Sequence, residues 1–177
     1  ERLNGSFIRL KTMPTPFYIV LASKMAVYLL VALTQIAFVF TLTKLTFPAL
    51  DLPQLTLPDD TIGFLLLSVV SSLAAVSYAL LIGSLAKTQQ QSYGFGAVSI
   101  VIFAAIGGIW VPSFVMPGYL QMLSMVSPLN WCLQGFYVLF LKGGSWAELI
   151  PVLLGISSFV LLCLVVVYFK LKKEKII

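Results

Sequence analysis

Few residues of this chain have side chains that could do chemistry, and their spacing matches no familiar catalytic site. The chain has no His, and its two Cys lie in different apolar segments, so neither a metal cluster nor a disulfide framework is expected. A serine hydrolase needs a base beside its Ser, and no His can serve as one. Lys87 and Thr88 resemble the end of a phosphate-binding loop, but Leu81 and Ala86 stand where that loop requires glycines. We therefore expect that this chain is not a self-sufficient enzyme.

The long uncharged stretches lack the groups that ion-driven transport uses. Positions 25–43, 61–86, 88–141 and 149–169 contain no Asp, Glu, Lys or Arg. Proton-coupled carriers place ionisable groups inside the membrane as relays, so no route is evident by which this chain could draw energy from a proton gradient. The scattered Ser, Thr and Gln of these stretches are expected to form hydrogen bonds between helices more often than to contact a substrate.

The same stretches predict the architecture. The chain is 60% hydrophobic and 10% charged, which excludes an ordinary soluble domain. A helix needs about 20 apolar residues to cross the roughly 30 Å hydrocarbon core of a bilayer. We predict an all-α integral membrane protein with four transmembrane helices, at about 18–43, 61–85, 93–110 and 149–169.

The basic residues predict which way these helices face. Nine of the eleven lie at the two ends of the chain or beside one internal loop: Arg2, Arg9, Lys11, Lys24, Lys87, Lys170, Lys172, Lys173 and Lys175. Lys and Arg near the ends of spans prefer the cytoplasmic side, so four spans place both termini of this chain in the cytoplasm. The net charge of +5 suits anionic lipid at that surface better than nucleic acid.

Residues 1–16 form a separate cytoplasmic segment in front of a transmembrane domain at 17–177. Leu3, Phe7 and Leu10 share one helical face, and prolines at 14 and 16 end the pattern. The pattern fits a basic amphipathic helix on the membrane surface, and it also fits a docking element for a cytoplasmic partner.

Residues 111–146 do not fit the pattern of a span. Pro112, Pro117 and Pro128 break this region into short pieces, and the piece 129–141 reaches only about 20 Å as a helix. A fifth crossing would also place the basic C-terminal residues outside. We predict an external re-entrant pair of short helices before the last span, which is either a surface cap or a gate at the outer end of a translocation route.

One face of the second span carries small residues at every fourth position. Ser71, Ala75, Ala79 and Gly83 form this stripe. Small side chains let another helix approach closely, so the stripe predicts helix packing rather than chemistry.

Two regions resemble type 2 ATP-binding-cassette (ABC) exporter permeases. The opening Glu1-Arg2-x-x-Gly5-Ser6-x-x-Arg9, followed by Pro14, is similar to the E-[RK]-x-x-G-[ST] segment of that family. Gly107-Gly108-Ile109-x-Val111-Pro112, with Met116-Pro117 and Ser127-Pro128-Leu129-x-Trp131-x-x-x-Gly135 after it, resembles the family's external turn before the last span. The order of these motifs and the four spans between them make the resemblance cover nearly the whole chain.

The resemblance implies roles for individual residues. It makes 1–14 a coupling helix that docks on a separate cytoplasmic ATPase subunit, with Glu1, Arg2, Gly5, Ser6 and Arg9 at or beside the contact. It makes 111–142 the external helical pair that narrows the exit, with a gate shaped by Pro112, Pro117, Pro128, Trp131 and Gly135. It also implies a permease half with six spans, of which this chain holds the last four.

The resemblance further implies a function and a set of partners. The chain would be the permease subunit of an ATP-driven exporter in the bacterial cytoplasmic (inner) membrane, paired with a second permease subunit as a homodimer or heterodimer. ATP and Mg would bind to the partner ATPase, so no cofactor is expected in this chain. Two other functions remain open: a membrane scaffold or assembly protein, and a carrier or channel that works without ATP. No residue identifies the exported substrate.

Overall fold

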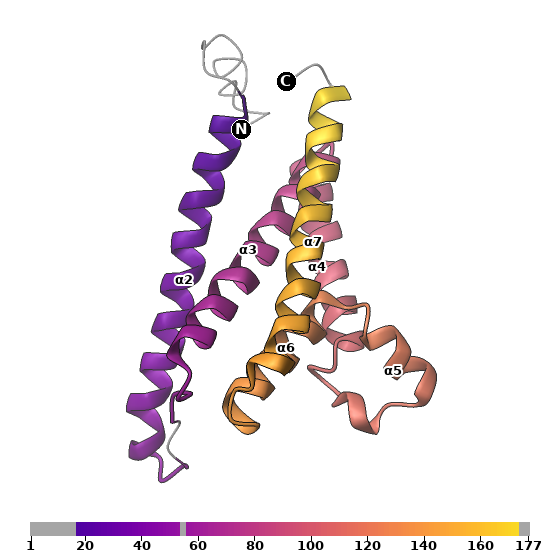
Figure 1. The fold of residues 1–177 in the computed structure, drawn as a ribbon. Coiled ribbons are helices and arrows are strands. Elements are labelled where there is room, and N and C mark those ends of the chain that lie inside the picture. Colours follow the sequence, from indigo (N-terminus) through magenta and orange to yellow (C-terminus); the bar gives the residue numbers. More distant parts are fainter. Residues whose placement is uncertain (1–16, 54–55, 174–177) are drawn as a thin grey trace.

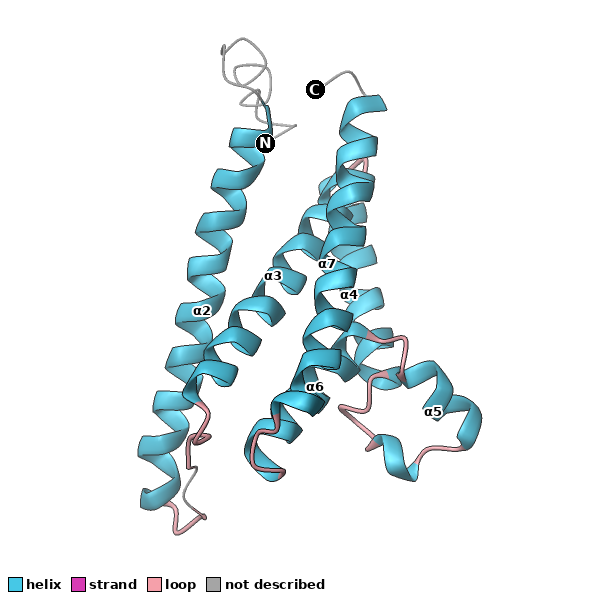
Figure 2. Ribbon diagram, viewed as in Figure 1, coloured by secondary structure: helices cyan, strands magenta, loops and turns pink. Residues whose placement is uncertain are grey.

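A computed structural model describes residues 17–53 and 56–173 of the chain. The described residues form six α-helices and one short 3₁₀ helix and contain no strand, which confirms the all-α prediction (Figure 2). In chain order the elements are α2 (Phe17–Ala49), α3 (Thr61–Leu85), α4 (Gln89–Ile106), η1 (Ser113–Val115), α5 (Gly118–Ser124), α6 (Pro128–Leu141) and α7 (Trp146–Lys173).

Three of the described helices are long and apolar enough to cross a membrane. These are Ile19–Ala49 within α2, Thr61–Leu85 and Trp146–Lys173. Helix α4 is not among them, because three glutamines, 89–91, occupy its first turn. The structure thus supports an all-α membrane protein, and the fourth crossing stays a prediction.

The predicted bounds are right for one of the long helices and too short for the other two. Helix α3 runs from Thr61 to Leu85, as expected, and its start is capped by the Asp60 carboxylate, which accepts a hydrogen bond from the Gly63 N–H at 3.0 Å. Helix α2 continues to Ala49 with Pro48 inside its last turn, and α7 begins before Pro151. The predicted spans ended beside Lys44, Glu148 and Lys170, the charged residues that bound the apolar stretches, whereas helical hydrogen bonding continues past all three.

Helix α4 begins and ends earlier than the predicted span 93–110. Its start is set by Thr88, whose hydroxyl accepts a hydrogen bond from the Gln91 N–H at 3.1 Å, while the Gln91 side chain accepts one from the Lys87 N–H at 2.9 Å. Its end is set by two glycines. A Cβ at Gly107 would lie 2.5 Å from the Phe103 carbonyl oxygen, and Gly108 has a φ of +87°, which favours glycine.

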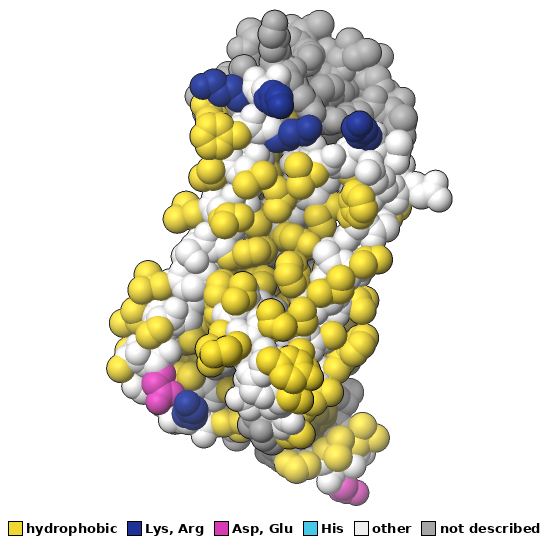
Figure 3. Space-filling model, turned by 90° about the vertical axis from the view of Figure 1, so that its right-hand side faces the viewer, with side chains coloured by type: hydrophobic (Ala, Val, Ile, Leu, Met, Phe, Trp, Pro, Cys, Tyr) yellow, Lys and Arg dark blue, Asp and Glu magenta, His cyan; other side chains and the backbone are white. Residues whose placement is uncertain are grey.

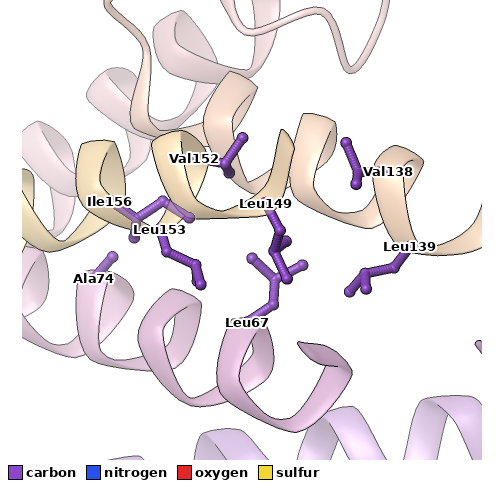
Figure 4. Close-up of a cluster of buried hydrophobic side chains, with 8 residues drawn as sticks. All are labelled: Leu67, Ala74, Val138, Leu139, Leu149, Val152, Leu153 and Ile156. Carbon is purple, nitrogen blue, oxygen red and sulfur yellow. The ribbon is translucent and has the colours of Figure 1, made fainter. Parts of the chain in front are cut away.

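Helix α3 is the centre of the bundle and contacts α2, α4, α6 and α7 (Figure 1). The buried core lies where α3 meets the α6–α7 hairpin (Figure 4), and it consists of Leu67, Ala74, Val138, Leu139, Leu149, Val152, Leu153 and Ile156. The hairpin turns sharply at Gly143 and Gly144, whose φ angles of +79° and +74° lie in the left-handed region that favours glycine.

Helix α2 is attached to this core by aromatic rings. The ring centroid of Phe40 lies 5.0 Å from that of Phe64 and 5.7 Å from that of Phe140. From this contact α2 and α3 diverge toward the opposite end of the bundle (Figure 1).

Candidate functional site

The two ends of the bundle differ in their charged side chains. One end of the bundle contains the start of α2, the turn between α3 and α4, and the last residues of α7. The basic residues at this end are Lys24, Lys87, Lys170, Lys172 and Lys173. Figure 3 shows basic side chains gathered at this end above a hydrophobic middle band. The described acidic residues, Asp51, Asp59, Asp60 and Glu148, belong to the other end, where Glu148 pairs with Lys142 at 2.9 Å. We call these the basic end and the acidic end.

The predicted coupling residues cannot be placed. Glu1, Arg2, Gly5, Ser6 and Arg9 lie outside the described residues, as does the whole segment 1–16. The coupling helix, and the division of the chain at residue 16, therefore stay predictions. The segment leads directly into α2, whose first residue Phe17 is at the basic end.

The turn between α3 and α4 lies at the basic end and is held by several hydrogen bonds. Ala86 is 6% exposed, and its N–H donates to the Ile82 carbonyl at 3.0 Å. The bond from the Gln91 N–H to the Thr88 hydroxyl and the bond from the Lys87 N–H to the Gln91 side chain then hold the first turn of α4. The turn thus presents Lys87, which is exposed, from a short rigid connection.

Three of the five predicted gate residues are packed inside the bundle. Pro128 is buried at the first position of α6, and Gly135 is buried against Leu67 of α3. Trp131 lies against α7, because a Cβ at Gly155 would be 3.2–3.4 Å from its indole ring. All three belong to the contact of α6 with its neighbours.

The other two predicted gate residues lie apart from this contact. Pro112 and Pro117 immediately precede η1 and α5 and are exposed. They belong to residues 107–127, which project from the side of the bundle around α5 (Figure 1). The structure therefore divides the five residues between a packed helix and a projecting segment, and a gate made by them stays a prediction.

The projecting segment, residues 107–127, is apolar on its surface. Its large exposed side chains are Ile109, Trp110, Val111, Val115, Tyr119, Met122, Leu123, Met125 and Val126, with Met122 at 74%. It leaves α4 and returns to α6 at nearly the same point, because the Ser127 hydroxyl donates to the Phe103 carbonyl at 3.1 Å. An apolar surface of this extent needs lipid or protein against it.

The stripe of small residues on α3 is not covered by another described helix. Ala75, Ala79 and Gly83 are exposed, and a Cβ at Gly83 would have no atom within 4 Å. The close helix packing predicted for the stripe, which starts at Ser71, is not found among the described residues and stays a prediction for the assembled protein.

Two grooves flank this stripe. One, of about 660 Å³, lies between α2, α3 and α7 and includes Ala75, Ala79 and Gly83 in its wall. The other, of about 520 Å³, lies between α3 and α4 and includes Ser71, Ala75 and Ala79. Both volumes fall in the range of about 300–1,000 Å³ that small-molecule sites occupy. In the described part of the chain, no group of three His, Cys, Asp or Glu side chains could hold a metal ion.

Comparison with known families agrees with this architecture. A family model described as ABC-2 type transporter matches residues 1–141, most of the 177 residues. The chain belongs to this family. No curated protein matches the chain, and no solved structure does. As an ABC-2 membrane domain the chain is a permease, and it is not itself catalytic.

The membership gives a reason for the exposed apolar surface of this permease. Helix α4 has no buried residue, and large side chains such as Tyr93, Phe95 and Val98 are exposed on it. In a bilayer such faces contact lipid tails or other helices, so their exposure in one ABC-2 chain is compatible with a stable fold.

Sequence reasoning missed a buried polar group at the joint of this permease's α4 and α6. Ser124, Ser127 and Asn130 are each at most 4% exposed, and the Asn130 side-chain oxygen accepts a hydrogen bond from Gln134 at 2.9 Å. The three-residue spacing of these polar residues, in an otherwise apolar part of the sequence, could have indicated this buried group. They hold the base of the projecting segment.

Proposed function

We propose that this chain is the transmembrane subunit of an ATP-driven ABC exporter, which couples ATP hydrolysis by a separate nucleotide-binding subunit to export of a substrate. The observation that carries the proposal is the match to the ABC-2 type transporter family over residues 1–141. Energy comes from the partner, where ATP and Mg bind. The long apolar stretches contain no acidic side chain that could relay protons, which agrees with an energy source outside this chain.

The basic end is the side on which the ATPase docks. Lys and Arg favour the cytoplasmic side of a membrane, and Lys24, Lys87 and the lysines that end α7 all belong to this end. We place the chain in the bacterial cytoplasmic membrane with both termini inside. The contact is formed by 1–14, through Arg2 and Arg9, and the capped turn at Lys87 lies on the same side.

The second permease subunit packs against α4 and the projecting segment. Helix α4 contacts α3 and α6 but buries none of its residues within this chain. Its exposed Val98, Val101 and Ile102 give it an apolar surface suited to another helix. A partner there would face the 107–127 segment as well, and the route for substrate would run between the two copies.

Helix α2 carries the movement from the ATPase to the rest of the chain. It is attached at its outer half through Phe40 and diverges from α3 toward the basic end. Closure of the ATPases on ATP moves 1–14, and α2 follows as a rigid body that pivots at the aromatic contact. The projecting segment then opens the outer end of the route.

The proposal is tested by co-expression of the chain with candidate ABC ATPases, purification and measurement of ATP hydrolysis in lipid. We expect the intact chain to retain an ATPase and stimulate it, and Arg2→Ala with Arg9→Ala to lose both effects. Lys172→Ala, which removes a charge from the same end, is the matched control and should keep them. If no ATPase binds the intact chain, or if the Arg variants behave as the control does, the coupling proposal is wrong.

A further inference from the structure

The groove between α2, α3 and α7 opens at the basic half of the bundle. Its volume is about 660 Å³. Helix α2 contributes one face, from Val20 to Gln35, and α3 contributes residues from Ala75 to Ser84. Val167 and Leu171 of α7 close the back of the groove and are buried.

The groove has the length of one membrane leaflet. Val20 and Gln35 are separated by about 22 Å along the axis of α2, and one leaflet with its headgroup region is about 20–22 Å thick, half of the about 40–45 Å of the whole bilayer. Because Val20 is near the start of α2 at the basic end, the groove runs from that surface to about the middle of the bilayer.

The groove is amphipathic along its length. Val31 and Ala32 of α2, with Ala75 of α3, give its deeper half an apolar wall. Lys24 is the charged residue among the described lining residues, and it lies two turns into α2, near the basic end. A Lys ammonium carries a positive charge and three N–H donors, which is the chemistry that a phosphate group binds.

We propose that this groove binds one anionic phospholipid of the cytoplasmic leaflet, with its phosphate at Lys24 and an acyl chain along α3 toward Gln35. An apolar groove that opens to a bilayer is in direct contact with lipid, and its position near the basic surface selects the headgroup. The described acidic residues all belong to the other end, so nothing described repels an anion there. A surface lysine attracts anionic lipid by about 1 kcal/mol, which is about a fivefold preference.

This proposal does not depend on ATP coupling, and its experiment contains no ATPase. The full chain is purified in mild detergent and mixed with equal amounts of phosphatidylglycerol and phosphatidylcholine that carry the same acyl chains. Native mass spectrometry then counts each retained lipid. The wild type should retain one phosphatidylglycerol, about fivefold more often than phosphatidylcholine.

Two variants test separately how the charge of the groove and its shape contribute to lipid binding. Lys24→Gln should reduce the preference for phosphatidylglycerol to about one. Gly83→Leu should reduce retention of both lipids, because the added side chain projects into open space along the groove. Lys172→Gln and Gly94→Leu are the matched controls. Lys172 is exposed at the basic end, Gly94 is exposed on α4, and neither lines the groove.

Thermal unfolding of each variant shows that it is folded, and Ala79→Leu repeats the shape test at a second exposed position of the groove. Equal retention of the two lipids by the wild type overturns the proposal. An unchanged preference in Lys24→Gln, or unchanged retention in both shape variants, overturns it as well. A disulfide-linked dimer formed by Gly83→Cys in membranes would show that a second copy covers the groove, and would also overturn it.

Discussion

Substitution of Gly135 by Ala tests whether this residue packs the bundle or shapes a gate. A Cβ at this position would lie 2.7 and 2.9 Å from the two terminal methyl groups of Leu67 and 3.2 Å from a methyl of Val152. Leu67 is fully buried, so its methyl groups have no open space to enter. Overpacking of this kind lowers the free energy of unfolding by about 1–3 kcal/mol.

A control is needed because Ala also favours a helix over Gly by about 1 kcal/mol. Gly94→Ala in α4 supplies it, since a Cβ there has nothing within 4 Å. The difference in unfolding free energy between the two variants removes the helix preference and leaves the steric effect of about 1–3 kcal/mol. The assay is reversible unfolding in detergent, followed by helical circular dichroism.

Double substitution identifies the contact that is responsible. Leu67→Ala alone should lower stability by about 2–5 kcal/mol, and the space it leaves can hold the new methyl at position 135. The double variant should therefore be less destabilised than the two single effects added together. Equal stability of Gly135→Ala and Gly94→Ala, or strict additivity with Leu67→Ala, would refute the packing argument. A loss of transport at unchanged stability would favour the gate.

Three further predictions follow from the described contacts. Trp131→Ala should lower unfolding stability by about 2 kcal/mol, because the half-buried indole leaves a space beside α7; an unchanged unfolding midpoint would contradict this. Thr88→Ala should destabilise the first turn of α4 by about 1 kcal/mol, measured as faster amide hydrogen exchange there, and equal exchange would show that the cap is unimportant. In a background without native cysteines, a membrane-impermeant thiol reagent added outside cells should label Asp59→Cys and not Gln90→Cys. Labelling at both positions would overturn the proposed orientation.

The long apolar helices could be predicted from the sequence because hydrophobic length and charge act locally. Helix α3 matches its predicted bounds, and its start depends on Asp60, one residue before it. The ends of α2 and α7 were less predictable, since the predicted bounds followed the charged residues Lys44, Glu148 and Lys170, and both helices continue past them. The family motif at 1–14 pointed to the ABC permeases, to which the chain belongs.

The positions of the candidate gate residues could not be predicted in the same way. Proline and glycine positions show where helices break, but they do not show what packs at each break. Gly135 is small because Leu67, far away in sequence, lies over it. Pro112, in contrast, is exposed. These outcomes depend on tertiary contacts between α3, α6 and α7, and periodicity within one helix carries no information on them.

The same contacts determine where the 14-residue helix α6 of the region 111–146 lies relative to α4. Helix α4 has 18 residues and reaches about 27 Å, and it runs from the basic end toward the acidic end. Helix α6 starts at the end of α4, where Ser127 bonds to the Phe103 carbonyl, and runs in the same direction until the glycine turn into α7.

Helices α4 and α6 are therefore two consecutive parts of one path from the basic end toward the acidic end. Together they extend about 48 Å, close to the about 50 Å of the 33 residues of α2. The apolar 107–127 segment leaves the bundle at the joint, partway along that path, and not beyond its outer end. A break at this depth is stable only if protein covers its backbone, and the buried Ser124, Ser127 and Asn130 lie at that joint. Any opening of an outer gate must therefore move the projecting segment about this polar joint, while α6 stays packed on α7.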